Sequence, residues 1–228
     1  MTEIRVEDWG TVAYDVAHAR QIELRDARIA DTVPDTLVIA AHPPVITLGR
    51  QGSMSNLRVS EDTLARMNIP LRHVERGGDI TYHGPGQIVA YPVVTLPVNR
   101  RDVKGFVRML EAVLLDVCAD AGVRSRRIPG LTGVWTADEG DDGTTPWHGE
   151  KKLAAIGVAF RRWVSWHGVA LNVAGDLTPF SCMHPCGLDG KSATSLSAET
   201  GREVAREEIV PVFVHHFTRH WRHFAHGS

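Results

Sequence analysis

The chain has 228 residues, of which 43% are hydrophobic and 23% charged, and its formal charge at pH 7 is −2. These values are typical of a globular protein, and the small net charge gives no support to nucleic acid as a partner. Three cysteines cannot form a paired disulfide framework and fit a reducing cytoplasm, so we expect a cytoplasmic protein. The sequence begins without a signal peptide's features and has no membrane-length apolar run, so no membrane is expected as a partner.

The first half of the chain predicts helices and strands in alternation. The predicted elements are a helix over 14–30, two short strands over 35–50 broken by Pro43 and Pro44, a short helix over 61–68 capped by Ser60, and a strand–loop–strand unit over 79–96. A longer helix follows, with Asp102 as its N-cap and Gly122 as its stop signal, because apolar residues recur on one helical face between them.

The second half predicts three strands and a final helix. The strands cover 131–137, 152–163 and 163–173, and an acidic, glycine-rich loop over 138–150 separates the first two. The final helix is predicted to begin near Pro211, with its histidines on the solvated face. No linker divides the chain, so residues 1–228 predict a single α/β (α+β) domain with a mixed sheet flanked by helices.

The three cysteines differ in their surroundings. Cys118 lies on an apolar helical face and is interpreted as a core residue. Cys182 and Cys186 lie in "TPFSCMHPCGLDG", which has neither helical nor strand periodicity. Cys182, His184 and Cys186 could ligate a metal, but zinc sites usually have a second ligand pair further on, so no metal site is predicted. Cys186 is then either a nucleophile or a loop cysteine without a role.

A nucleophilic Cys186 would need a base or a cationic neighbour from elsewhere in the chain. The stretch "RGGDITYHGPGQ" (76–87) contains the most candidate residues. Its glycines allow close approach of a ligand, Arg76 offers a planar set of donors, and His83 could polarise a reacting group. It matches neither a phosphate-binding loop nor a dinucleotide fingerprint. A glycine-rich hairpin with a structural histidine remains the alternative.

Two further stretches are informative. In "EKKLAAIGV", strand alternation puts Lys152 on one face with Ala154 and Ile156, where an apolar environment should lower the pKa of its amine enough to move protons near pH 7. A lysine at a solvated strand end is the alternative. In "WHGVALNV", Gly168 and Ala170 leave room either for a ligand tail or for tight sheet packing.

Together these stretches resemble one known family. The motifs that carry the resemblance are "GTVAY", "HPPVITLGR", "RGGDITYHGPGQIVAYP", "GVW", "KLAAIGV", "HGVALNV", "PCGL" and "TSLSAE", which span about residues 10–201. In combination they resemble the lipoyl(octanoyl) transferase family of acyltransferases, which act in lipoate biosynthesis and protein lipoylation. The resemblance implies a fold like the catalytic domains of biotin and lipoate protein ligases.

The resemblance also implies site residues. Cys186 matches the family's nucleophile, which carries the acyl group as a thioester, and Lys152 matches its partner in a Cys/Lys dyad. The family's acyl-binding segments match Arg76, Gly77, Gly78, Asp79, Ile80, Thr81, Tyr82, His83, Ala155, Ile156, Gly157, Gly168, Val169 and Ala170.

The implied partners are acyl carrier protein as octanoyl donor and, as acceptors, the lipoyl domains of 2-oxoacid dehydrogenase complexes and the glycine cleavage H protein. No cofactor is expected, and we expect a monomer. Arginine-rich stretches at 100–108 and 124–127 could dock acidic partners. The rival hypotheses are an ATP-dependent lipoate or biotin protein ligase, a thiol hydrolase that uses Cys186 and His83, and a non-catalytic acyl-binding module.

Overall fold

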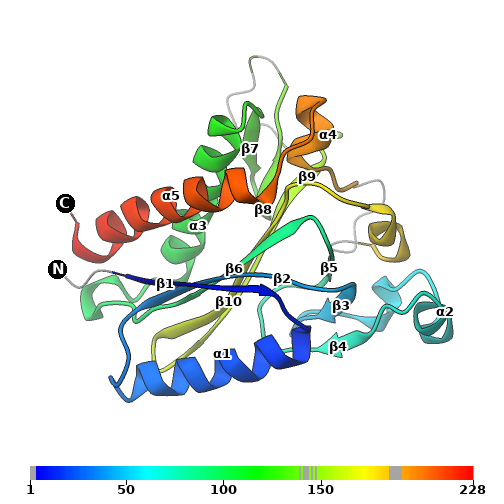
Figure 1. The fold of residues 1–228 in the computed structure, drawn as a ribbon. Helices are drawn as coiled ribbons and strands as arrows, with labels where there is room; N and C mark the ends of the chain where they lie inside the picture. Colours follow the sequence, from blue (N-terminus) through cyan, green and yellow to red (C-terminus); the bar gives the residue numbers. More distant parts are fainter. Residues whose placement is uncertain are drawn as a thin grey trace.

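The computed structural model describes residues 4–227 apart from 139, 141–143, 145, 147 and 185–191. Its centre is a seven-stranded sheet built from β1 (Arg5–Thr11), β2 (Thr36–Ala41), β6 (Gln87–Val93), β7 (Ser125–Ile128), β8 (Leu131–Thr136), β9 (Lys152–Arg161) and β10 (Val164–Asn172). The strand order is β1-β2-β6-β10-β9-β8-β7 (Figure 1). Only the β1–β2 pair is parallel among these neighbours, so the sheet is mixed, as predicted.

Helices cover both faces of this sheet (Figure 1). Helices α3 (Val103–Asp120) and α5 (Arg206–His226) pack together on one face, and α1 (Tyr14–Ile29) lies on the other. The main core lies under α3 and α5, because Phe106 and Leu110 of α3 and Phe213 and Phe217 of α5 recur at helical spacing and are fully buried. None of the helices in the described ranges combines the length and apolarity needed to cross a membrane.

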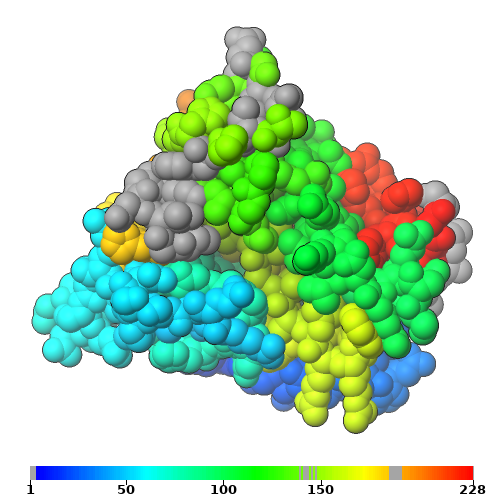
Figure 2. Space-filling view, turned by 180° about the vertical axis from the view of Figure 1, so that it is seen from behind, coloured from blue at the N-terminus to red at the C-terminus, as the bar shows by residue number. Residues whose placement is uncertain are grey.

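A second, three-stranded sheet lies beside the first. It consists of β4 (Leu71–His73), β3 (Val45–Leu48) and β5 (Ile80–His83), in the order β4-β3-β5, with the short helix α2 (Glu61–Arg66) next to it (Figure 1). Seen from behind in Figure 2, this cyan segment forms one flank, the green α3 forms the other, and the yellow β9–β10 hairpin emerges between them. The remaining short helices are η1 (Met54–Asn56), η2 (Val98–Arg100), η3 (Thr178–Cys182) and α4 (Leu196–Thr200).

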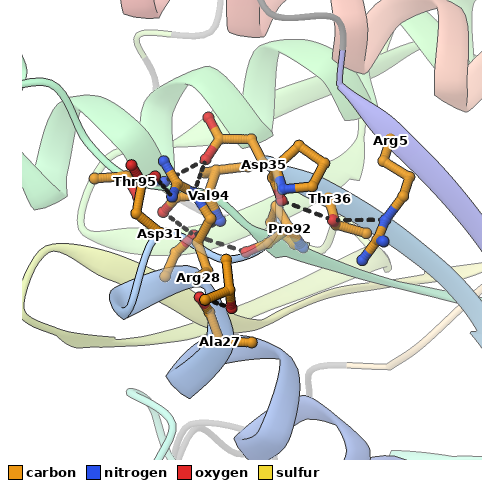
Figure 3. Close-up of polar contacts among 12 residues, drawn as sticks. Arg5, Ala27, Arg28, Asp31, Asp35, Thr36, Pro92, Val94 and Thr95 are labelled. Carbon is orange, nitrogen blue, oxygen red and sulfur yellow. Dashed lines mark hydrogen bonds and ion pairs between the residues drawn. The ribbon is translucent and has the colours of Figure 1, made fainter.

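Polar contacts fix the C-terminal end of α1 against the sheet (Figure 3). Arg28 near the end of α1 pairs with Asp35 at 2.8 Å, and Asp35 also accepts a hydrogen bond of 2.9 Å from the backbone N–H of Thr95. Because Asp35 precedes β2 and Thr95 follows β6, the contacts tie the helix to two strands at once. These contacts fix the position of α1, so Tyr14 at its N-terminal end has a defined place against the sheet.

The predicted elements are present, with differences at their ends. Asp102 occupies the N-cap position of α3, but its side chain makes no capping hydrogen bond. Helix α5 begins at Arg206 and not near Pro211, because the Glu208 carboxylate accepts from the Ala205 N–H at 2.9 Å and starts the helix earlier. The expectation that the α5 histidines are all solvated is wrong for His216, which is 6% exposed and hydrogen-bonds Asp120 at 2.8 Å.

Candidate functional site

A cavity of about 530 Å³ lies between the two sheets and the N-terminal end of α1. It is lined by residues of β5, β6, β9 and β10 and of the loop that precedes β5. Lys152 lines it, and so do all the predicted acyl-binding residues other than Gly77 and Tyr82: Arg76, Gly78, Asp79, Ile80, Thr81, His83, Ala155, Ile156, Gly157, Gly168, Val169 and Ala170. The volume is that of a typical small-molecule site.

One wall of the cavity is the β9–β10 ladder, in which small residues face each other. Ala155 pairs with Ala170, and Gly157 pairs with Gly168. A Cβ atom on Gly168 would lie 2.0 Å from the backbone oxygen of Ala90, so this glycine is required by the neighbouring strand β6. Gly168 therefore serves tight sheet packing, whereas Ala170 leaves space beside the cavity.

Lys152 is the first residue of β9 and reaches the cavity through an irregularity in the strand. Val134 of β8 pairs with Ala154, but the next residue, Trp135, pairs with Lys152, so the register shifts by one residue. The predicted shared face of Lys152, Ala154 and Ile156 is therefore wrong, because a bulge turns Lys152 to the side of Trp135. The Lys152 Nζ lies 5.0 Å from the centroid of the Trp135 ring.

The chain that follows the undescribed segment 185–191 is bound to Lys152. The Lys152 N–H donates to the Ser192 oxygen at 2.8 Å, and the Thr194 N–H donates to the Lys152 oxygen at 3.0 Å. Asn172 of β10 supports this arrangement, because its Nδ2 donates to the Thr194 oxygen at 2.9 Å and its Oδ1 accepts from Gln87 at 2.9 Å. The backbone of Lys152 is thus held from two sides.

The chain that precedes segment 185–191 is bound at the other border of the cavity. The His184 N–H donates to the backbone oxygen of Asn56 at 2.8 Å, and Asn56 lines the cavity. Cys186, the predicted nucleophile, lies outside the described residues, two positions after His184. The described residues on both sides of this segment therefore contact cavity-lining residues.

Arg76 and His83 are both buried in the cavity wall. Arg76 donates from Nη2 to the backbone oxygen of Thr47 at 2.7 Å, which fixes the guanidinium against β3. His83 hydrogen-bonds Gln87 at 3.3 Å, and burial lowers the pKa of His83 to about 3. His83 is accordingly a neutral imidazole at physiological pH.

Four aromatic residues around the His83 end of the cavity were not singled out from the sequence. Tyr14, Tyr91 and His167 line it, and His42 lies behind them with its Nε2 at 2.6 Å from the Tyr91 hydroxyl. The Tyr14 and His83 rings stack at 6.0 Å. All four stood within motifs that carried the family resemblance, which was the available signal: Tyr14 in "GTVAY", His42 in "HPPVITLGR", Tyr91 in "RGGDITYHGPGQIVAYP" and His167 in "HGVALNV". Potential metal ligands also meet here, because His18 and Glu75 approach His167.

The other sequence-based expectations have mixed outcomes. Cys118 is a core residue, and burial raises the pKa of its thiol to about 12. Cys182 is buried in the small apolar cluster beside the three-stranded sheet. Arg126 is wrong as a docking residue, because it is 4% exposed and forms a buried ion pair with Glu150.

Known proteins resemble this chain over most of its length. Residues 13–218 match the family described as "Lipoyl protein ligase A/B catalytic domain". The chain is 43% identical over 214 residues to an octanoyltransferase of Syntrophotalea carbinolica, covering 94% of this chain and 92% of the relative. It is 44% identical over 206 residues to an octanoyltransferase of Geobacter metallireducens, covering 90% and 87% of the two chains.

Solved structures share the fold. A bipartite lipoate protein ligase from Thermoplasma acidophilum, described together with its E2 lipoyl domain, matches with a TM-score of 0.72 at 16% identity over 97% of this chain and 85% of the other. A lipoate-protein ligase A bound with ATP matches with a TM-score of 0.69 at 17% identity, over 97% and 86%. The predicted likeness to lipoate ligase catalytic domains is confirmed. The chain belongs to the lipoyl protein ligase A/B catalytic domain family and, within it, to the octanoyltransferases.

Proposed function

We propose that this octanoyltransferase works through a thioester on Cys186, with Lys152 as the group that moves protons. The observation that carries the proposal is the position of Lys152. Its side chain lies over Trp135 in the wall of the cavity, and its backbone is bonded to Ser192 and Thr194, which follow the segment of Cys186. The donor is an octanoyl thioester on acyl carrier protein, and the acceptor is a lysine of a lipoyl domain.

In the first step the sulfur of Cys186 attacks the carbonyl carbon of the donor thioester. A new carbon–sulfur bond forms, and the bond to the carrier's phosphopantetheine sulfur breaks. The amine of Lys152 takes the proton of the Cys186 thiol and returns it to the departing thiolate. Because one thioester replaces another of similar energy, the step needs no ATP and no cofactor.

In the second step the ε-amine of the acceptor lysine attacks the acyl-enzyme. The carbon–nitrogen bond of an amide forms, and the bond to the Cys186 sulfur breaks. Lys152 accepts a proton from the attacking nitrogen and passes it to the Cys186 sulfur, which restores the starting state. The amide is more stable than the thioester, so the second step makes the overall reaction favourable.

His83 is a poorer base than Lys152 for this chemistry. Burial and the positive charges of neighbouring groups lower its pKa to about 3, whereas an efficient general base has a pKa near the working pH. His83 also stacks on Tyr14 and bonds Gln87, which suits a wall residue. This observation favours the transferase over the hydrolase that would pair Cys186 with His83.

The cavity is suited to the acyl chain. From Lys152 to Gly157, β9 runs along it for about 16 Å at 3.3 Å per residue, which is longer than an extended octanoyl chain. The small side chains of Ala155 and Ala170 leave the space open, and Ile156 and Val169 also border it. Each buried methylene contributes about 0.8 kcal/mol, so chain length affects binding directly.

The proposed acceptors are lipoyl domains of 2-oxoacid dehydrogenase complexes and the glycine cleavage H protein, and the enzyme acts as a monomer. The related Thermoplasma ligase, whose structure is described with an E2 lipoyl domain, supports the acceptor class. Arg100, Arg101, Lys104 and Arg108 remain the candidate docking surface for acidic partners. They lie at η2, at the start of α3 and along it.

An assay with purified components tests the proposal. Octanoyl-carrier protein and an apo lipoyl domain, without ATP, should give the octanoylated domain, and free octanoate with ATP should not. Product that requires ATP and free acid would favour a ligase. Octanoate released without an acceptor domain would favour a hydrolase. Acyl binding without any turnover would favour a binding module.

A further inference from the structure

Three potential metal ligands from distant parts of the chain meet beside the cavity, and His167 is the one of them that lines it. His18 lies in α1, Glu75 precedes the Arg76 loop, and His167 lies in β10. In the described part of the chain, this is the one group of at least three His, Cys, Asp or Glu residues whose ligand atoms all lie within 4.8 Å of one another. None of the three serves the proposed acyl-transfer chemistry.

The spacing of the three ligand atoms fits a small divalent cation. The His18 Nε2 lies 3.0 Å from the Glu75 Oε2, and the His167 Nε2 lies 3.8 Å from the same oxygen. Two ligands bound tetrahedrally at about 2.1 Å from zinc are about 3.4 Å apart, which falls between these two distances. The His18 and Glu75 side chains are 23% and 49% exposed, which leaves both of them room to adjust around an ion.

His167 gives an independent indication that a ligand belongs here. Its side chain is 2% exposed, and its Nε2 has no hydrogen-bond partner within the described structure. An unpartnered polar atom in a buried site is costly, and a bound water or ion is one way in which such an atom is satisfied.

The surroundings allow a metal and also limit its type. Arg25 and Arg76 add positive charge near His167, which opposes a cation, and the Glu75 carboxylate supplies the negative charge that favours one. The Glu75 side chain is 49% exposed, so water can occupy a fourth position. Two imidazoles and one carboxylate favour zinc and similar transition metals over calcium or magnesium, which prefer oxygen ligands.

We propose that His18, Glu75 and His167 form a binding site for a divalent transition metal of the zinc class. The metal joins α1 to β10 and to the loop that carries Arg76. His167 lines the acyl cavity and precedes Gly168, so a bound metal stiffens the floor of that cavity. The inference does not depend on the thioester mechanism, because it concerns binding by residues that take no part in acyl transfer.

Metal binding by the untagged full-length chain tests the proposal directly. The chain is made metal-free with a chelator and titrated with Zn²⁺ by calorimetry and with Co²⁺ by visible absorption. Wild type should bind one Zn²⁺ at this site and show the visible bands of nitrogen- and oxygen-bound Co²⁺. His18→Ala and Glu75→Gln should each weaken this binding by about tenfold or more, and Zn²⁺ should raise the melting temperature of wild type but not of these variants.

Three matched variants separate this site from others that could bind metal. His73→Ala removes an exposed histidine outside the cluster and should bind as wild type does. Cys186→Ser and the combined change of His215, His223 and His226 to Ala should keep the His18-dependent binding. The proposal is overturned if wild type binds neither metal, if His18→Ala binds within about twofold of wild type, or if binding disappears with Cys186→Ser or with the tail variant.

Discussion

The Nζ of Lys152 lies 5.0 Å from the centroid of the Trp135 ring, because a register shift between β8 and β9 pairs these two residues. An aromatic face attracts a cation and also excludes water from one side of it. Lys152 is therefore positioned by a strand irregularity and by an aromatic neighbour, at one border of the cavity.

Lys152→Met tests the role of this amine. It keeps the length of the side chain and removes the proton-carrying nitrogen, so we expect acyl transfer to fall by about 10²- to 10⁴-fold with an unchanged fold. Steady-state kinetics of lipoyl-domain octanoylation measure the loss. Lys151→Met is the matched control, because Lys151 is exposed and pairs with Glu199 at 3.5 Å. Equal losses in the two variants would contradict the assignment.

Much of the fold could be predicted from the sequence. The helix-forming composition of its segment located α1, and helical periodicity located α3, because burial on one face of a helix leaves a regular pattern. The strands β9 and β10 were also located from the sequence. Strand β1 was not predicted, because its sequence "RVEDWGT" mixes charged and apolar residues at a sheet edge. The bulge that turns Lys152 toward Trp135 was also missed, because one extra residue in a strand leaves no clear mark in a sequence.

The candidate site could be predicted only in part. The glycine-rich stretch and the two strand motifs were recognisable because each is continuous. The cavity floor was not, because Tyr14, His42, Tyr91 and His167 come from separate elements that only the folded sheet brings together. The same holds for His18 and Glu75 beside His167, because only the fold brings these three residues together.

Acyl-chain length should respond to the size of residue 170. Ala170→Val adds volume at the cavity wall, so we expect octanoyl transfer to fall and hexanoyl transfer to be affected less. In wild type, an acyl chain that is two methylenes shorter should bind about 15-fold more weakly, because burial of two methylenes contributes about 1.6 kcal/mol. Competition between the two acyl donors measures this preference.

Ala154→Val is the matched control for that substitution. Ala154 packs into the main core on the opposite face of the sheet, so the change should lower stability without altering chain-length preference. The cavity assignment fails if both variants shift the preference equally.

Asn172 should act as a positioning residue. Its amide bonds Thr194 at 2.9 Å and Gln87 at 2.9 Å, and so supports the backbone that holds Lys152. Asn172→Ala leaves these buried groups without a partner, and we expect a loss of about 1–3 kcal/mol in the free energy of unfolding together with a lower kcat. Denaturant unfolding and kinetics measure the two effects. A lower stability with an unchanged kcat would show that Asn172 supports the fold alone.

Stability should decrease in acid because of the buried histidines. The folded chain holds the pKa of His83 at about 3, chiefly through burial, whereas the unfolded chain has the ordinary value near 6.5. Between these pH values the unfolded state binds more protons, so the free energy of unfolding falls as the pH falls. His83→Gln should reduce that slope by about 1.4 kcal/mol per pH unit. An unchanged slope in denaturant titrations between pH 6 and 4 would contradict the assignment of a neutral, buried imidazole.

The central claim is that the octanoyl group passes through the sulfur of Cys186. Intact-mass analysis after mixing the enzyme with octanoyl-carrier protein, without an acceptor domain, tests it most directly. Wild type should gain the mass of one octanoyl group, and hydroxylamine should remove it, whereas Cys186→Ala should gain none. An unmodified wild type that still octanoylates lipoyl domains, or an adduct that persists in Cys186→Ala, would contradict the claim.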